Sequence, residues 1–243
     1  MATAIHAGHS LRPEISALIA LDEDTRLREE DPYTDLLAEA VSLRAVADRS
    51  RFEIDLNRPR HEAVYLEPEQ AWGLEVWKVL PTPAEVEASL RIHDQFYEEM
   101  AKRLDELAAT GPFVVLDIHS YNHRHDGPDA APAGIEGNPD VNVGTGALDR
   151  TLWRGLVDGF MLDFQSRLPP TSTIAENVRF KGGYFSTWVD DRYVERGCCL
   201  ALEFKKTFMN EWTGEADPAR IAAIRSALAD TIPALVTELG RLK

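Results

Sequence analysis

Short apolar runs alternate along this chain with longer segments whose apolar residues recur at helical spacing. Phe113–Ile118 is a run of β-branched and apolar residues, which predicts a buried central strand of a mostly parallel sheet. Cys198–Phe204 predicts a second buried strand, and the short apolar run Ala2–Ile5 predicts a first strand that enters a loop at Gly8. Arg51–Leu56 alternates between polar and apolar residues and is also predicted to be a strand.

Helical spacing extends over residues 15–46 and is broken where Asp31 precedes Pro32. Proline disfavours the helical conformation at the residue before it and suits the first turn of a new helix. We therefore predict a helix over Tyr33–Ala47 with Asp31 as its N-cap. Further helices are predicted over Pro83–Ala109, Leu148–Arg167 and Asp217–Lys243, the last with an interruption near Pro233.

Strands that alternate with helices predict an α/β fold. We expect a three-layer sandwich around a mixed, mostly parallel central sheet, and the length of 243 residues predicts one domain over residues 1–243. Residues 122–146 are rich in His, Pro, Gly, Asp and Asn and predict a long loop after the central strand. A loop of this length in a compact domain is typically functional or mobile.

Acidic residues outnumber basic ones, 41 against 26, and the formal net charge is −15. Nucleic-acid binding needs clustered lysine and arginine, so this balance argues against a general nucleic-acid surface. No stretch approaches the roughly 18 consecutive apolar residues of a membrane span, and residues 1–7 lack the pattern of a secretion signal. We therefore expect a cytoplasmic protein without nucleic-acid or membrane partners. The adjacent Cys198 and Cys199 are expected to be buried strand residues rather than a disulfide.

Histidines follow two of the predicted strands. His119 ends the central strand, and ligand sites of open α/β sheets lie at the carboxyl ends of strands. Asp117 lies two residues earlier on the same face of the strand, where it could orient a metal-bound His119. His6 ends the first strand, and His9 follows three residues later. The alternative is that these histidines only close strands or lie in turns, but two strand-end histidines in one α/β chain favour a shared metal site.

Charged residues in and after two strands predict further chemistry. Arginine suits bidentate binding of carboxylates, so Asn57 beside Arg58 predicts a pocket for a carboxylate-bearing substrate. The alternative is a surface network of ion pairs with Asp48, Glu53 and Asp55. Glu203 is a lone carboxylate in a buried strand, which is costly unless the group is paired or functional. Beside a metal it would suit a general base, and the alternative is an ion pair with Lys205 or Lys206.

Six segments together resemble the N-formylglutamate amidohydrolase family, which is related in fold to the zinc carboxypeptidases and aspartoacylases. The resemblance follows the order of the chain through most of its length. In that order, the segments are His6-Ala-Gly, Glu30-Asp-Pro-Tyr-Thr-Asp35, Arg51 with Ile54-Asp-Leu-Asn-Arg58, Asp117-Ile-His-Ser120, Lys181-Gly-Gly-Tyr184 and Ala201-Leu-Glu203.

The resemblance implies a zinc-carboxypeptidase-like fold and a set of site residues. His6 and His119 would bind one zinc ion, although such mixed sites also accept other divalent metals. The third ligand is expected at Asp31, with Glu30 or His9 as alternatives, because His9 stands where related carboxypeptidases carry a carboxylate. The remaining roles are Glu203 as general base, Arg51 as oxyanion donor, and Asn57, Arg58, Tyr184 and His9 as substrate-binding residues.

The implied reaction is hydrolysis of the linear amide bond of an N-acyl amino acid, including an N-formyl one, by zinc-activated water. Two alternatives remain at the level of the sequence. One is a metallocarboxypeptidase that acts on peptides, and the other is a non-catalytic relative that binds a small molecule.

Overall fold

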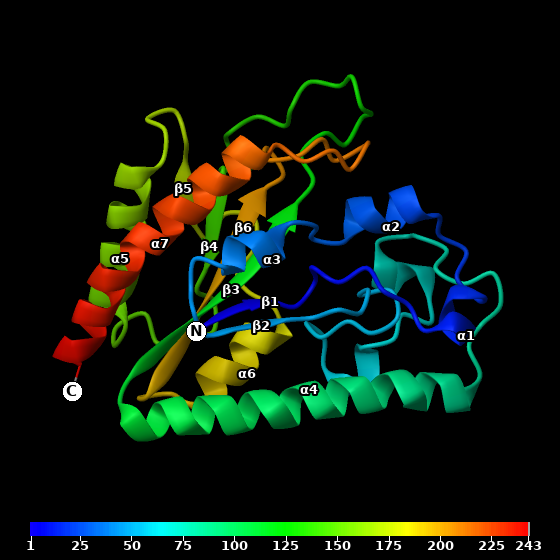
Figure 1. Ribbon diagram of the computed structural model, residues 1–243, viewed down its shortest axis with the longest axis horizontal. Coiled ribbons are helices and arrows are strands. Elements are labelled where there is room, and N and C mark those ends of the chain that lie inside the picture. The colour runs from blue at the N-terminus through cyan, green and yellow to red at the C-terminus, as the bar shows by residue number, and fades with distance from the viewer. Residues whose placement is uncertain (243) are drawn as a thin grey trace.

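The computed structural model describes residues 1–242, and its centre is one sheet of six strands in the order β2-β1-β3-β6-β4-β5. The strands are β1 (Ala2–Ala4), β2 (Arg44–Val46), β3 (Phe113–Tyr121), β4 (Val141–Gly144), β5 (Ile174–Glu176) and β6 (Gly197–Lys205). The first four strands of that order are parallel to one another, whereas β4 runs antiparallel to β6 and parallel to β5. The predicted α/β fold with a mixed, mostly parallel sheet is confirmed (Figure 1).

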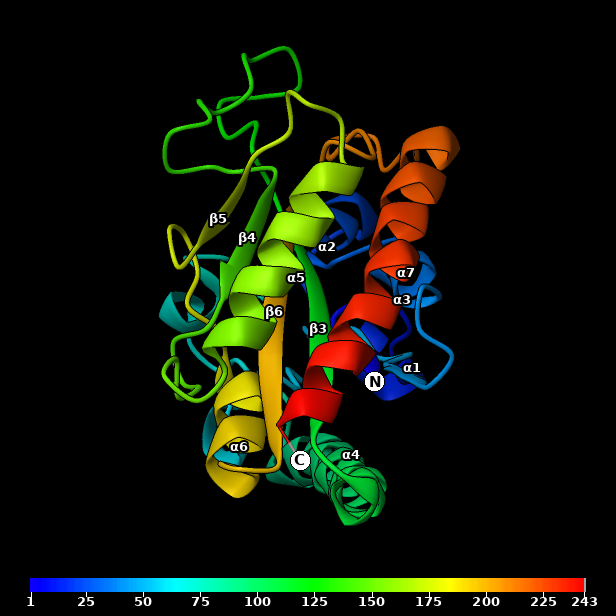
Figure 2. The ribbon, with the colours of Figure 1, turned by 90° about the vertical axis from the view of Figure 1, so that its left-hand side faces the viewer.

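Helices cover both faces of this sheet (Figures 1 and 2). They are α1 (Pro13–Ser16), α2 (Glu23–Glu29), α3 (Thr34–Ala38), α4 (Pro83–Thr110), α5 (Arg154–Arg167), α6 (Tyr184–Arg192) and α7 (Pro218–Arg241), with 3₁₀ turns η1 (Arg60–Glu62) and η2 (Pro68–Ala71). Helices α3, α5 and α7 share one apolar core with the sheet, and α4 and α6 share the other. The expected three layers are therefore present.

The central pair β3–β6 places the predicted chemistry. Their parallel register runs from Phe113 opposite Gly197 to Tyr121 opposite Lys205, and it sets His119 directly opposite Glu203. Leu116 of β3 packs into the α5–α7 core, and Val115 packs into the α4–α6 core. Because side chains alternate along a strand, Asp117 and His119 lie on the α4–α6 face.

The predicted strand over Arg51–Leu56 is wrong. This segment forms consecutive turns, in which the N–H groups of Glu53 and Ile54 both donate to the backbone oxygen of Ser50. Glu53 and Asp55 are fully buried, so the alternation of polar and apolar residues does not separate an exposed from a buried face here.

The predicted helix over Tyr33–Ala47 is also wrong in extent. Helix α3 ends at Ala38, and the chain then forms β2, which pairs with β1 at the edge of the sheet. Tyr33, not Asp31, is the N-cap residue, and it has a left-handed φ of 68°. Pairing with an existing strand overrides helical propensity in this short segment.

Other predictions hold with shifted limits. The long helix over 83–109 and the strands at 2–5, 113–118 and 198–204 are confirmed, and both cysteines are buried and free. The predicted loop over 122–146 contains β4, and α5 begins at Arg154 instead of Leu148. Helix α7 continues through Pro233, and the predicted helix end at Lys243 lies outside the described residues.

Besides β2 and β4, strand β5 and helix α6 were not predicted either. Among residues 1–242, no helix combines the length and the apolar character needed to cross a membrane.

Candidate metal centre

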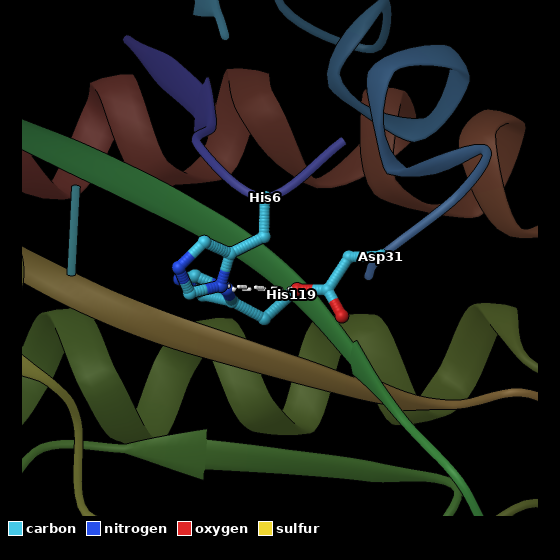
Figure 3. A group of neighbouring side chains, drawn as sticks. All are labelled: His6, Asp31 and His119. Atoms are coloured by element: carbon cyan, nitrogen blue, oxygen red, sulfur yellow. Dashed lines mark hydrogen bonds and ion pairs between the residues drawn. The ribbon is translucent and has the colours of Figure 1, made fainter. Parts of the chain in front are cut away.

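His6, Asp31 and His119 converge at the carboxyl ends of β1 and β3 (Figure 3). Each offers one ligand atom, and these atoms all lie within 4.8 Å of one another. His6 lies just after β1, His119 belongs to β3, and Asp31 lies between α2 and α3. All three side chains are buried.

Asp117 orients His119. Its Oδ2 accepts a hydrogen bond from Nε2 of His119 at 3.0 Å, while its Oδ1 accepts one from the hydroxyl of Thr3 at 2.7 Å. The predicted contact between Asp117 and His119 is therefore confirmed. The other ring nitrogen, Nδ1, lies 3.0 Å from Oδ2 of Asp31 and faces the centre of the cluster.

Asp55 does the same for His6. Its Oδ1 accepts a hydrogen bond from Nε2 of His6 at 2.7 Å, and Nδ1 of His6 lies 3.5 Å from Oδ2 of Asp31. Oδ2 of Asp55 accepts hydrogen bonds from Nη2 of Arg51, at 2.8 Å, and from the hydroxyl of Tyr65. Sequence reasoning missed Asp55 as a partner of His6 because the two residues are 49 positions apart.

Asp31 is held as an ionised carboxylate. Burial by itself would raise its pKa, but hydrogen bonds and charges from His119 and His6 outweigh that effect and lower the pKa. Its backbone N–H donates to the carbonyl of His6 at 2.9 Å, and the hydroxyl of Ser120 donates to Oδ1 at 3.2 Å. Backbone and side chain of Asp31 are therefore both fixed at the cluster.

The donor set fits a divalent cation. Two imidazole nitrogens and one carboxylate oxygen are a typical ligand set of catalytic zinc, which keeps a further position open. Each histidine also donates its second N–H to a carboxylate, as metal-binding histidines usually do. The buried carboxylates of Asp31, Asp55 and Asp117 give this region an excess of negative charge that a cation would balance.

Glu30 and His9 lie in a separate network. Oε2 of Glu30 is 2.5 Å from Nδ1 of His9, and its Oε1 accepts a hydrogen bond from the hydroxyl of Ser50. Nε2 of His9 lies 3.0 Å from Nη2 of Arg26. Of the three predicted candidates for the third ligand, the structure thus groups Asp31 with the two histidines.

Glu203 lies beside this cluster and has an unusual acidity. Burial raises its pKa to about 7, with the charge of His119 opposing the shift and that of Asp31 adding to it. The alternative of an ion pair with a neighbouring lysine does not hold, because Lys205 pairs with Asp140 and Lys206 binds backbone oxygens. A carboxylate with a pKa near neutrality is suited to accept and return a proton.

Of the predicted substrate residues, Asn57 and Tyr184 meet at the N-terminus of α6, whereas His9 lies in the network with Glu30. Oδ1 of Asn57 accepts a hydrogen bond from the backbone N–H of Phe185 at 2.9 Å. The backbone carbonyl of Asn57 accepts one from the backbone N–H of Tyr184 at 3.3 Å. Gly183 permits this approach, since a Cβ there would clash with the side-chain amide of Asn57. Arg58 follows Asn57, and within residues 1–242 its guanidinium makes no hydrogen bond or ion pair, which leaves it available for an anion.

Arg51 adjoins the cluster through Asp55, and its side chain is 12% exposed. Besides binding Asp55, its guanidinium contacts the hydroxyl of Tyr65 at 3.3 Å and stacks on Trp72, 4.7 Å from the ring centroid. These contacts hold the cation in one orientation near His6. Tyr65 and Trp72 carried no signal in the sequence, because neither residue stands near His6, His119 or the end of a predicted strand.

The sequence pattern of the N-formylglutamate amidohydrolase family matches residues 1–209. The chain belongs to the N-formylglutamate amidohydrolase family. This match spans His6, Asp31, His119 and Glu203, and membership supports a hydrolase activity for the chain. No curated protein sequence matches the chain.

Solved structures share the fold. An N-formylglutamate amidohydrolase from Ralstonia eutropha JMP134 has a TM-score of 0.76 and 18% identity, covering 99% of this chain and 93% of that one. A gene product of Agrobacterium tumefaciens has a TM-score of 0.62 and 16% identity, covering 97% and 90%. A metallo-carboxypeptidase from Burkholderia cenocepacia scores 0.33 at 19% identity over 55% of this chain and 33% of that one, which is too low to establish a common fold.

Proposed function

We propose that this protein is a metal-dependent amidohydrolase that cleaves the linear amide bond of an N-acyl amino acid, with N-formyl amino acids among its substrates. The observation that carries the proposal is the cluster of His6, Asp31 and His119 with Glu203 beside it, in a chain of this family. Its substrate is then a small anionic molecule.

His6, Asp31 and His119 would hold the ion, and their nitrogen and oxygen donors suit zinc. When bound, zinc supplies Lewis acidity and lowers the pKa of water to about 7. Both histidines are kept in the ligating tautomer, because their Nε2–H groups donate to Asp55 and Asp117.

Glu203 would move the protons of the reaction. Because its pKa is about 7, a large fraction of the side chain is ionised at neutral pH and can accept a proton from the attacking water. The same carboxylic acid then donates that proton to the nitrogen of the leaving amine. Its place opposite His119 in the sheet register puts it next to the ligand cluster.

Arg51 and Arg58 would handle the negative charges of substrate and transition state. Arg51 is held by Asp55 and Tyr65 close to His6, where it can donate to the acyl oxygen as that oxygen becomes negatively charged. One such donor contributes roughly 3–4 kcal/mol to transition-state stabilisation. Arg58, with Asn57 and Tyr184 beside it, would bind the carboxylate of the amino acid.

The test combines metal analysis with a substrate screen. Purified protein loaded with zinc is assayed for amine release from N-formyl, N-acetyl and longer N-acyl amino acids, and from short peptides. We expect about one metal ion per chain and release from N-acyl amino acids. His119→Ala should lose both the metal ion and the amine release. His61→Ala changes a histidine with 79% side-chain exposure and should keep both.

Three results would contradict the proposal. Release only from peptides would favour a metallocarboxypeptidase. Binding of N-acyl amino acids without turnover would favour a non-catalytic relative. Full metal retention in His119→Ala would exclude the ligand set.

A further inference from the structure

Lys206, the residue directly after β6, is buried near Asp31 without binding a carboxylate. Lys206 is only 1% exposed. Its Nζ donates to the backbone oxygens of Arg28, at 2.5 Å, and Glu30, at 2.7 Å, and to Oδ1 of Asn122 at 3.0 Å. An ammonium group has three N–H donors, so these acceptors use all of them.

These acceptors belong to two segments, one directly before Asp31 and one directly after β3. Glu30 directly precedes Asp31, and Arg28 lies three residues before it. Asn122 directly follows β3, the strand of His119, and its Nδ2 donates in turn to Oε1 of Glu29 at 3.1 Å. One ammonium group therefore joins the chain around Asp31 to the end of the central sheet.

The backbone of Lys206 strengthens this connection. Its N–H donates to the carbonyl of Tyr121, the last residue of β3, at 3.0 Å. Lys206 also lies three residues after Glu203 on the same strand and its extension. The residue thus has fixed positions relative to the strand of His119, the strand of Glu203 and the loop of Asp31.

We propose that Lys206 is a positioning residue, which holds the Asp31 segment at the distance from β3 that metal binding requires. This inference rests on the metal site proposed above. Whereas His119 belongs to β3 and His6 follows β1 by two residues, Asp31 lies in the loop between α2 and α3. Its place relative to His6 and His119 therefore depends on contacts that tie its loop to the strands.

A contribution to fold stability alone is a weaker explanation for the buried ammonium group of Lys206. Removal of an ammonium group from water is unfavourable, and an apolar side chain of similar volume often stabilises a fold equally well. An apolar side chain cannot bind the two backbone oxygens of Arg28 and Glu30 at defined distances. Removal of a group that orients metal ligands without binding the metal typically lowers metal affinity by about 10–100-fold.

The neighbouring lysine provides a matched control. Lys205 is also buried, with 5% exposure, and also stands at the end of β6. Its Nζ pairs with Oδ1 of Asp140 at 3.3 Å, before β4. Replacement of Lys205 therefore removes a buried ammonium of the same strand without releasing the segment that carries Asp31.

The experiment measures zinc affinity by competition with a chromophoric chelator, and the visible absorption of the cobalt-loaded protein. We expect Lys206→Met to weaken zinc binding by about 10–100-fold and to change the cobalt spectrum. Lys205→Met should keep the zinc affinity within about twofold of the wild type and leave the cobalt spectrum unchanged, even if its melting temperature falls. Asn122→Ala, which removes one of the three acceptors and serves if Lys206→Met does not fold, should weaken zinc binding by a smaller factor.

The outcomes separate the two proposals. Unchanged zinc affinity in Lys206→Met or in Asn122→Ala would overturn the positioning role, as would an equal loss in Lys205→Met. Failure of the wild-type protein to bind zinc, or retention of zinc by His119→Ala, would instead overturn the metal site itself.

Discussion

The two histidines of the cluster are held in the same way at the residue level. Each donates Nε2–H to a buried aspartate, His6 to Asp55 and His119 to Asp117, and each turns Nδ1 towards Asp31. A carboxylate partner selects the ring tautomer and makes the imidazole a better ligand. The cluster therefore depends on two aspartates that lie outside the proposed ligand set.

Asp55→Asn should weaken metal binding by about 10–100-fold, because an amide oxygen carries no charge to make His6 a better ligand and the amide nitrogen cannot accept from Arg51 and Tyr65. The measurement is zinc affinity by chelator competition, with folding checked by circular dichroism. Asp94→Asn is the control, since this aspartate pairs with Arg60 at the surface. Equal affinity in Asp55→Asn and wild type would exclude an orienting role.

Glu203→Gln should separate binding from turnover. Glutamine keeps the size of the side chain but cannot accept a proton, so we expect normal zinc content and a fall in kcat of about 10²–10⁴-fold. Metal analysis and steady-state kinetics on the same preparation provide the measurement. Substantial turnover with full metal content would assign the proton transfer to another group.

At the level of elements, α6 is tied to the central strand β6 by an aspartate of high pKa. Oδ1 of Asp190 accepts a hydrogen bond from the backbone N–H of Cys199 at 2.8 Å. Burial raises the pKa of Asp190 to about 7, although that hydrogen bond opposes the shift. Since α6 begins at Tyr184, this contact also supports the helix that carries a predicted substrate residue.

The raised pKa of Asp190 predicts a stability that depends on pH. Above about pH 4 the unfolded chain loses this proton while the folded protein keeps it up to about pH 7, so the free energy of unfolding falls as the pH rises through that window. The Asp190 contribution lost between these limits is of the order of 4 kcal/mol. Urea unfolding at pH 4, 5, 6, 7 and 8 should show this fall in the wild type relative to Asp190→Asn. Parallel curves for the two proteins would contradict the assignment.

At the scale of the whole molecule, the cluster joins segments that are far apart in the chain. His6, Asp31 and His119 meet only when β1 and β3 are paired and the loop between α2 and α3 lies against them. A metal bound by all three therefore stabilises the folded state selectively, because the unfolded chain offers no such site.

Saturating zinc should raise the melting temperature, and a chelator should reverse the effect. At a free concentration about 100 times Kd, the stabilisation is about 2.7 kcal/mol. For a chain of this size that corresponds to roughly 5–10 °C. Differential scanning calorimetry checks the shift, and His119→Ala should show none. A shift of equal size in that variant would place the stabilising ion elsewhere.

Local patterns predicted much of this fold. Apolar runs along the sequence identified β1, β3 and β6, and the ends of these runs placed His6, His119 and Glu203 at one edge of the sheet. Parallel strands bring their carboxyl ends to the same edge, so strand order along the chain was sufficient for this step. The order of the family segments added Asp31 as a neighbour.

The segment 51–56 resisted prediction for a physical reason. Its polar residues are buried because each finds a partner from a distant part of the chain: Glu53 binds Arg12, and Asp55 binds His6. Periodicity assumes that polar side chains face water, and it fails where tertiary contacts satisfy them inside. The same contacts make Asp55 part of the cluster.

The sequence by itself determined the fold class and the strand-end histidines, because hydrophobic periodicity and residue order are local properties. Only the tertiary structure decided which groups support those histidines. The contacts of Asp55 with His6 and of Lys206 with the Asp31 segment join residues 49 and 176 positions apart. Such pairs depend on how the sheet and its loops pack, and no spacing along the chain encodes them.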